Sequence, residues 1–144
     1  MKINQQKVIV TGGAGFIGSH LTDALIERGF DVYVIDNLVS GKKENVHPAA
    51  HFHEVDIRNF EDIAPIFKGA TYVFHLAALP RVQRSIEDPR TTHEVNVSGT
   101  LNVFIAARDA KVKRVVYSAS SSAYGNHETL PLHEELDARP MHPY

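Results

Sequence analysis

Residues 8–18 read Val8-Ile9-Val10-Thr11-Gly12-Gly13-Ala14-Gly15-Phe16-Ile17-Gly18, an apolar run followed by glycines at three-residue spacing. Gly12 can adopt a turn conformation closed to larger residues, Gly15 has no Cβ to keep a phosphate from the backbone, and Gly18 allows close helix packing. The free N–H groups and positive dipole end of the following helix attract anions. The stretch therefore predicts a βα turn that binds the two phosphates of a dinucleotide.

The residues around this turn have the pattern of a complete nucleotide-binding unit. A strand at 8–10 precedes it, and a helix with apolar residues on one face follows and ends at Gly29. The next apolar run, 32–35, ends in Asp36, whose carboxylate can accept hydrogen bonds from both hydroxyls of an adenosine ribose. Because a carboxylate would repel a 2′-phosphate, the sequence favours NAD over NADP.

Length and composition indicate a single globular domain. The chain has 144 residues, a net charge of −2, a pI near 6.5 and no cysteine. The charge gives no reason to expect nucleic acid or an anionic membrane as a partner, and the missing thiols exclude disulfides and thiolate metal sites. No apolar run approaches the roughly 20 residues of a membrane span, and the first six residues lack the apolar core of a signal peptide. We therefore expect a cytoplasmic location.

Apolar runs alternate with helical patterns along the chain, which is typical of a parallel sheet covered on both faces. Further strands are expected at 52–55, 72–74 and 114–118, and helices at 60–67 and 92–110. A loop containing Pro80 and Pro89 precedes the longer helix, and Thr91 with Glu94 fits a capping box at its start. The predicted fold class is α/β, a doubly wound parallel sheet (Rossmann fold) that stops after about five strands. Its ligand is expected at the carboxyl ends of the strands, beside the first-to-fourth crevice.

Several short motifs fall on that rim of the sheet and carry a family resemblance. They are Thr11 to Leu21, Asp36-Asn37, Asp56-Ile57, His75-Leu76-Ala77-Ala78, Asn96 to Thr100, Ser120 to Gly125 and Pro143-Tyr144. With these motifs the chain resembles an extended short-chain dehydrogenase/reductase of the NAD-dependent nucleotide-sugar epimerase/dehydratase family. The resemblance runs from end to end, so we expect residues 1–144 to form the NAD-binding domain of a longer protein, without its later strands and carboxyl-terminal substrate domain.

The resemblance also implies individual roles. Asp56 would bind the adenine amino group, Ile57 would pack on the ring, and Asn96 would hold the sheet and the active-site backbone in register. Ser120 would be the catalytic hydroxyl and Tyr144 the catalytic base, with the paired lysine four residues beyond Tyr144. The expected cofactor-binding residues are Gly12, Gly15, Phe16, Ile17, Gly18, Asp36, Asn37, Asp56, Ile57, Leu76, Ala77, Ala78, Asn96, Ser118 and Tyr144; the expected substrate-binding residues are Pro80, Arg81, Arg84, Ser120 and Ser122.

The residues after Ser120 discriminate between reactions of the family. Dehydratases carry Asp-Glu directly after the catalytic threonine, and decarboxylating relatives place a glutamate where Ser122 stands. Serines at 121 and 122 provide neither group, so 4-epimerisation of a nucleotide sugar is favoured. The loop at 79–85 resembles that of bacterial UDP-glucose and UDP-N-acetylglucosamine 4-epimerases, which makes a UDP-sugar the expected substrate. Arg81 or Arg84 could meet a phosphate, although a solvated charged loop explains either one equally well.

Other interpretations remain open at this stage. The chain could be a non-catalytic NAD-binding module, or part of another oxidoreductase on the same scaffold, such as a 4-reductase or a steroid-type dehydrogenase. His51 and His53 could converge on one face of a strand, but no third ligand completes a metal site, so no metal is expected. His75 is expected to be a packed residue with a hydrogen-bonded ring. We also expect a homodimer in the complete protein, and an unpaired apolar edge at 115–117 that favours association of this chain alone.

Overall fold

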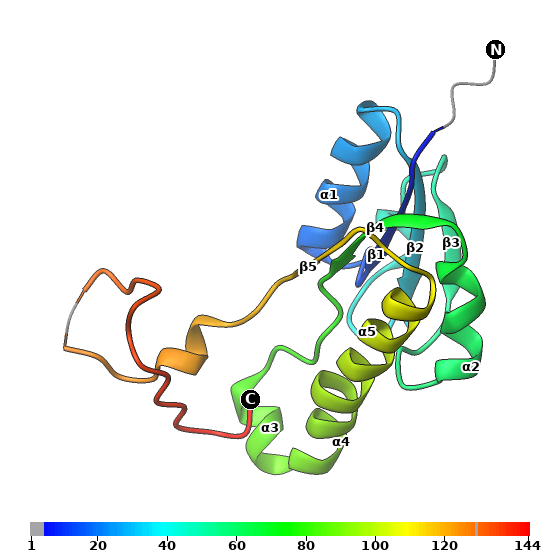
Figure 1. Ribbon diagram of the computed structural model, residues 1–144. Coiled ribbons are helices and arrows are strands. Elements are labelled where there is room, and N and C mark those ends of the chain that lie inside the picture. The colour runs from blue at the N-terminus through cyan, green and yellow to red at the C-terminus, as the bar shows by residue number, and fades with distance from the viewer. Residues whose placement is uncertain (1–4, 129) are drawn as a thin grey trace.

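Five strands form one parallel sheet in the computed structural model, which describes residues 5–128 and 130–144 (Figure 1). The strand order is β3-β2-β1-β4-β5, so the order reverses at β1, and the doubly wound fold class is confirmed. The strands are β1 (Lys7–Thr11), β2 (Asp31–Asp36), β3 (His51–Glu54), β4 (Ala70–His75) and β5 (Arg114–Tyr117). The helices are α1 (Phe16–Glu27), α2 (Phe60–Ile63), α3 (Val82–Glu87), α4 (Pro89–His93) and α5 (Thr100–Asp109).

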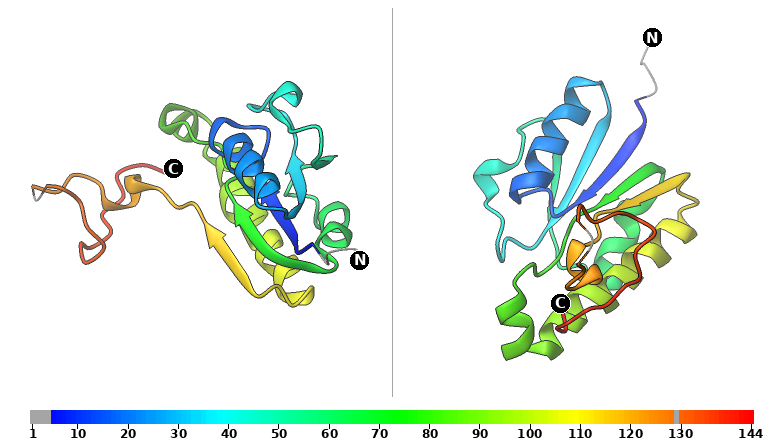
Figure 2. Two further views of the ribbon diagram at one scale, coloured as in Figure 1. Left: turned by 90° about the horizontal axis from the view of Figure 1, so that it is seen from above. Right: turned by 90° about the vertical axis from the view of Figure 1, so that its left-hand side faces the viewer.

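Helices lie on both faces of the sheet because its central strands are apolar on both sides. Val8, Val10, Val32 and Val34 form one core cluster, on the face that α1 covers through Leu25. Ile9, Ile35 and Val73 point to the opposite face, where α2, α5 and the 3₁₀ turn Ala64–Phe67 cover them. Figure 2 shows these layers from two further directions. The run of β-branched residues in the centre is what a strand buried on both faces requires.

The start of the longer helix differs from the prediction. The helical run begins at Pro89 rather than Thr92, and the side chain of Asp88 caps it by accepting a hydrogen bond from the Thr91 N–H at 3.1 Å. The capping box assigned to Thr91 and Glu94 is therefore wrong. Aspartate is a good N-cap, and proline suits the first helical position because it has no N–H that would be left without a partner there.

Two other expected boundaries also change. The loop predicted between Pro80 and Pro89 contains the short helix α3, so Arg81 is its N-cap and Arg84 lies inside it. The helix predicted at 60–67 is α-helical only to Ile63 and continues as a 3₁₀ turn, because Pro65 has no N–H to donate to the preceding turn.

A π-helical segment, Glu94–Gly99, interrupts the run between α4 and α5. Within it Asn96 turns toward the chain that follows β4: its Oδ1 accepts from the Leu79 N–H at 2.8 Å, and its Nδ2 donates to the Leu79 carbonyl at 3.2 Å. Gly99 lies against Ile57, where an added Cβ would come within 2.8 Å of the Ile57 side chain. π segments of this kind are frequent at functional sites.

The chain after β5 extends away from the sheet and its end returns to α3 (Figures 1 and 2). The Tyr144 N–H donates a hydrogen bond to the buried Ser85 Oγ at 3.1 Å, which ties the end of the chain to that helix. β5 pairs with β4 on one side, and Val116 and Tyr117 are each about half exposed. No helix within residues 5–128 and 130–144 is both long and apolar enough to cross a membrane.

Candidate active site

A cavity of about 420 Å³ lies at the carboxyl ends of the central strands, in the size range typical of ligand sites. It is lined by the turn after β1, the ends of β2 and β4, the chain after β5 and the last residue of the chain. Of the predicted site residues, those at the cavity are Gly12, Gly15, Phe16, Ile17, Gly18, Asp36, Asn37, Ile57, Leu76, Ala77, Ala78, Pro80, Ser118 and Tyr144. The fold therefore gathers residues spread over the whole sequence into one site.

The glycine-rich turn has the shape that a diphosphate requires. Gly12 has a φ of +72°, and an added Cβ would lie 2.8 Å from the Ala77 backbone nitrogen. A Cβ on Gly18 would overlap the Gly12 carbonyl oxygen, whereas one on Gly15 would approach that oxygen at 3.3 Å and otherwise meet open space. The first N–H groups of α1 have no partner in their own helix and border the same space. The residues present thus fit a dinucleotide, with Gly15 on the side that faces it.

The Asp36 carboxylate stands at the end of β2 and borders the cavity. Its Oδ2 accepts from the Ala14 N–H at 3.0 Å and its Oδ1 accepts from the Leu38 N–H at 2.8 Å. Each oxygen of a carboxylate has two lone pairs, so both oxygens keep capacity for a further donor. This geometry suits a group that receives two neighbouring ribose hydroxyls.

A row of buried, hydrogen-bonded side chains lies beneath the cavity and connects β1, β4 and α5. The Thr11 Oγ1 lies 2.6 Å from His75 Nδ1, and His75 Nε2 lies 2.8 Å from the Thr100 Oγ1. Thr11 Oγ1 also accepts the N–H groups of Leu76 and Ala77, so its single proton is donated to His75 Nδ1 and Nε2 carries the ring proton. The expectation of a packed, hydrogen-bonded His75 is confirmed. Burial lowers the pKa of His75 to about 4, which keeps the ring neutral at neutral pH.

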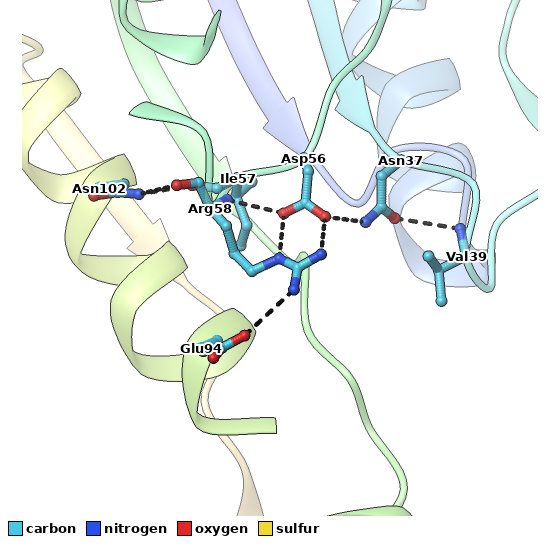
Figure 3. Close-up of polar contacts among 7 residues, drawn as sticks. All are labelled: Asn37, Val39, Asp56, Ile57, Arg58, Glu94 and Asn102. Atoms are coloured by element: carbon cyan, nitrogen blue, oxygen red, sulfur yellow. Dashed lines mark hydrogen bonds and ion pairs between the residues drawn. The ribbon is translucent and has the colours of Figure 1, made fainter. Parts of the chain in front are cut away.

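The segment after β3 forms the outer edge of the site, shown in Figure 3. Ile57 borders the cavity, and Asp56 lies beside it with its side chain largely buried. The Arg58 guanidinium donates to both oxygens of Asp56, from Nε to Oδ1 at 3.0 Å and from Nη2 to Oδ2 at 2.8 Å. The backbone N–H of Arg58 also donates to Oδ1, at 2.9 Å. Asn37 Nδ2 donates to Oδ2 at 2.8 Å. The hydrogen bonds from Arg58 lower the pKa of Asp56 to about 2.

The predicted residues that do not border the cavity are Asp56, Arg81, Arg84, Asn96, Ser120 and Ser122. Asn96 acts on the site through Leu79, which does border it. Ser120 caps the 3₁₀ turn Ser121–Tyr124 by accepting the Ser122 N–H at 3.1 Å. Arg81 and Arg84 sit on α3, outside the lining.

Sequence reasoning missed several residues at or beside this site. Those that border the cavity are Ile35, Val39, Ser40, Val55, Leu79, Val95 and Ala119. Val39 and Ser40 border the cavity from the loop after β2, which Gly41 holds against Ala14 so closely that a Cβ would meet Ala14 Cβ at 2.8 Å. Val95 borders it from the π segment. Arg58 was missed because its role depends on the tight turn after β3; the Asp-x-Arg spacing was its one sequence signal.

His51 and His53 do share a face of β3, where both rings stack on Tyr33 with centroid distances of 4.4 and 5.8 Å. His51 Nε2 also lies 2.9 Å from the Asp31 Oδ1. In the described part of the chain, no three histidine or carboxylate side chains are grouped to hold a metal ion.

Comparison with known proteins gives a consistent result over nearly the whole chain. Residues 8–144 match the family described as the NAD dependent epimerase/dehydratase family. The UDP-glucose 4-epimerase of Lactobacillus helveticus is 37% identical over 140 residues, which cover 96% of this chain and 42% of that protein.

Solved structures agree. The UDP-glucose 4-epimerase of Thermotoga maritima, solved with UDP-glucose, superimposes with a TM-score of 0.93 at 40% identity and covers 96% of this chain and 46% of that one. The UDP-glucose 4-epimerase of Thermus thermophilus, solved with NAD, gives a TM-score of 0.88 at 42% identity with the same coverage. The chain therefore spans somewhat less than half the length of these relatives.

Proposed function

Because the chain belongs to the NAD-dependent epimerase/dehydratase family, we propose that its protein inverts C4 of a nucleotide sugar, of the UDP-glucose/UDP-galactose type, through a transient 4-keto sugar. The observation that carries this proposal is that the glycine-rich turn, Asp36 and Tyr144 border the same cavity. NAD, when bound, supplies the group that accepts the C4 hydride and returns it to the other face.

The residues of the cavity divide the work of holding the dinucleotide. Gly15 and the N–H groups that open α1 would receive the diphosphate, since they border the open side of the turn. Asp36 would accept the ribose hydroxyls with the lone pairs that Ala14 and Leu38 leave free. The small side chains of Ala77 and Ala78 leave room for the cofactor beside β4.

Proton transfer would fall to Tyr144, with Ser120 as its hydroxyl partner. Tyr144 borders the cavity, and its backbone is fixed to Ser85, whose own Oγ donates to the Val82 carbonyl at 2.6 Å. The Tyr144 oxygen would take the proton of the sugar C4 hydroxyl as the hydride leaves and return it later. Ser120 has a free proton to donate, because its Oγ acts as an acceptor in its contact with Ser122.

Epimerisation asks little more of the protein than this. An elimination would need a further acid and base next to Ser120, where this chain has Ser121 and Ser122. The relatives named above are UDP-glucose 4-epimerases, which supports the same reaction type and a UDP-sugar as substrate. A cytoplasmic location and a homodimer of the complete protein belong to this proposal.

Two measurements test it. Calorimetric titration of the 144-residue chain with NAD should give a 1:1 isotherm, and the protein extended through its downstream reading frame should interconvert UDP-glucose and UDP-galactose without net NADH. NADH that accumulates in step with product would instead identify a dehydrogenase. We expect the 144-residue chain alone to show no measurable interconversion, because it spans less than half the length of the epimerases that it matches. Turnover by this chain would contradict that expectation.

The same assay distinguishes a non-catalytic NAD-binding module. In that case NAD would bind, and the extended protein would show no turnover with either sugar. Tyr144→Phe in the extended protein is the matched control, because it removes one hydroxyl and leaves the backbone contact to Ser85 in place. Its turnover should fall by about 10²- to 10⁴-fold, the usual contribution of a general acid or base, with NAD affinity unchanged.

A further inference from the structure

The segment Asp56–Arg58 is held rigidly at the outer edge of the cavity. Asn102 Nδ2, on α5, donates to the Ile57 carbonyl at 3.1 Å and to the Arg58 carbonyl at 2.9 Å (Figure 3). Gly99 packs against the Ile57 side chain from the same helical run. The backbone beside the cavity therefore has two anchors that do not involve any ligand.

Arg58 fixes the Asp56 side chain as well. Its guanidinium forms two parallel hydrogen bonds to the carboxylate, a geometry that a lysine cannot reproduce. Glu94 lies 3.6 Å from the Arg58 Nη1 and holds the far side of the guanidinium. Neither Asp56 nor Arg58 borders the cavity, but Asp56 is hydrogen-bonded to Asn37, which does. Arg58 is one step further away, so it would act on a ligand through Asp56.

The Asp56 carboxylate presents acceptors and no donor to its surroundings. Three of the four hydrogen bonds that it accepts from described residues come from Arg58, and the fourth comes from the side chain of Asn37, a residue that borders the cavity. A carboxylate has about four lone-pair sites, so a ligand donor must take the place of an existing one. The Asn37 amide is the replaceable partner, because it is exposed and makes one hydrogen bond to this group.

The position of the segment Asp56–Arg58 relative to Asp36 determines which part of a bound dinucleotide would contact it. Asp36 pairs with Glu54 at the end of β3, so the chain after β3 lies beside the place assigned to the adenosine ribose. The base attached to that ribose would meet Ile57 and Asn37, which border the cavity, and behind Asn37 the Asp56 carboxylate to which it donates. An amino group can replace the Asn37 donor, whereas a 6-oxo group would place a second acceptor against the carboxylate.

We propose that Arg58 is the positioning residue that makes this edge selective for a 6-aminopurine over a 6-oxopurine, by holding the Asp56 oxygens so that the base amino group replaces the Asn37 amide. The inference rests on the proposed NAD site and adds to it the residue that sets base selectivity. Removing Arg58 would free the Asp56 side chain to rotate, and the selectivity would fall while the diphosphate and ribose contacts remained.

The test is calorimetric titration of the 144-residue chain with ADP-ribose and with its hypoxanthine counterpart, inosine diphosphate ribose. The unsubstituted chain should bind the hypoxanthine compound about 10- to 100-fold more weakly, the range expected when a buried acceptor loses its donor. In Arg58→Met the ratio of the two dissociation constants should fall to within about threefold of 1. Arg58→Lys, which keeps the charge without the paired hydrogen bonds, should fall in between.

Arg108→Met is the matched control, because Arg108 also pairs with a neighbouring aspartate but lies exposed on α5, away from the cavity. It should keep the full ratio. NMR titration of the Asp56 carboxyl gives an independent measure: its pKa, about 2 with Arg58 present, should rise in Arg58→Met.

Each outcome decides the matter. Equal binding of the two compounds by the unsubstituted chain would overturn this proposal, even if the variants did not fold. A folded Arg58→Met that still bound ADP-ribose as selectively as the unsubstituted chain would also overturn it. Failure to bind either compound, or NAD, would instead reject the cofactor site, so the two proposals fail in distinguishable ways.

Discussion

Replacing the buried His75 with asparagine should make the stability of the fold much less sensitive to mild acid. His75 is fully buried between the Thr11 and Thr100 hydroxyls, and its ring stacks on Tyr117. Protonation would put a charge in this site and remove the acceptor that Thr11 needs at Nδ1. Asparagine offers an acceptor near the same position and does not titrate.

The magnitude follows from the two pKa values. Burial lowers the pKa of His75 in the folded protein from 6.5 to about 4, so between these values the unfolded chain binds a proton that the folded chain does not. The contribution of neutral His75 to the free energy of unfolding is therefore fully present above pH 6.5 and is lost as the pH falls toward 4. A difference of about 2.5 pKa units at about 1.36 kcal/mol each gives a loss of about 3 kcal/mol.

The assay is urea unfolding of both proteins, followed by circular dichroism at pH 7, 6, 5 and 4. At pH 7 the variant should be less stable by about 1–3 kcal/mol, because Thr100 loses its partner. The gap should close or reverse by pH 4. Other groups, including His53 with its lowered pKa, remain in both proteins and cancel in the difference. Parallel stability curves from pH 7 to 4 would refute the assignment of a neutral, acid-sensitive His75.

Four further substitutions test other parts of the molecule. Gly15→Ala should leave the melting temperature nearly unchanged and weaken NAD binding by about tenfold or more. Gly18→Ala should destabilise the fold by about 1–3 kcal/mol, because its Cβ would overlap the Gly12 carbonyl. If the two variants lost the same NAD affinity in calorimetry and the same melting temperature, this difference between the two glycines would be contradicted. Asp36→Asn should weaken NAD binding about tenfold and reduce the preference for NAD over NADP, since it removes the charge that repels a 2′-phosphate. Calorimetric titration with both dinucleotides measures the two affinities. Val116→Lys on the edge strand should reduce self-association in sedimentation at high concentration, and a strictly monomeric parent chain would speak against an adhesive edge.

The sheet was predictable because its signals are local. Val8–Val10, Val32–Ile35 and Tyr72–Phe74 are short apolar runs bounded by turn residues, and each lies within a strand of the structure. The glycine-rich turn and Asp36 were predictable for the same reason, since the motif specifies backbone conformation and charge within one βα unit. The structure places the turn and Asp36 at one cavity.

The helical region after β4 was less predictable because tertiary contacts decide it. The π segment depends on the hydrogen bonds of Asn96 to Leu79, and on Gly99 meeting Ile57, and neither contact leaves a periodic signal in the sequence. The N-cap is Asp88 rather than Thr91 because Pro89, which has no N–H, suits the first position of the helix. Arg58 escaped notice because a chelate between residues two apart requires a turn whose shape only the fold specifies.

The central strand β1 has neighbours at very different distances along the chain. It pairs with β2 directly after the first helix, but its other partner is β4, and Thr11 meets His75 across 64 residues. During synthesis, the glycine-rich turn therefore emerges from the ribosome long before the residues that hold it from the other side. The coenzyme cradle is encoded first and completed late, so a nascent chain released before residue 75 would lack the strand that closes it.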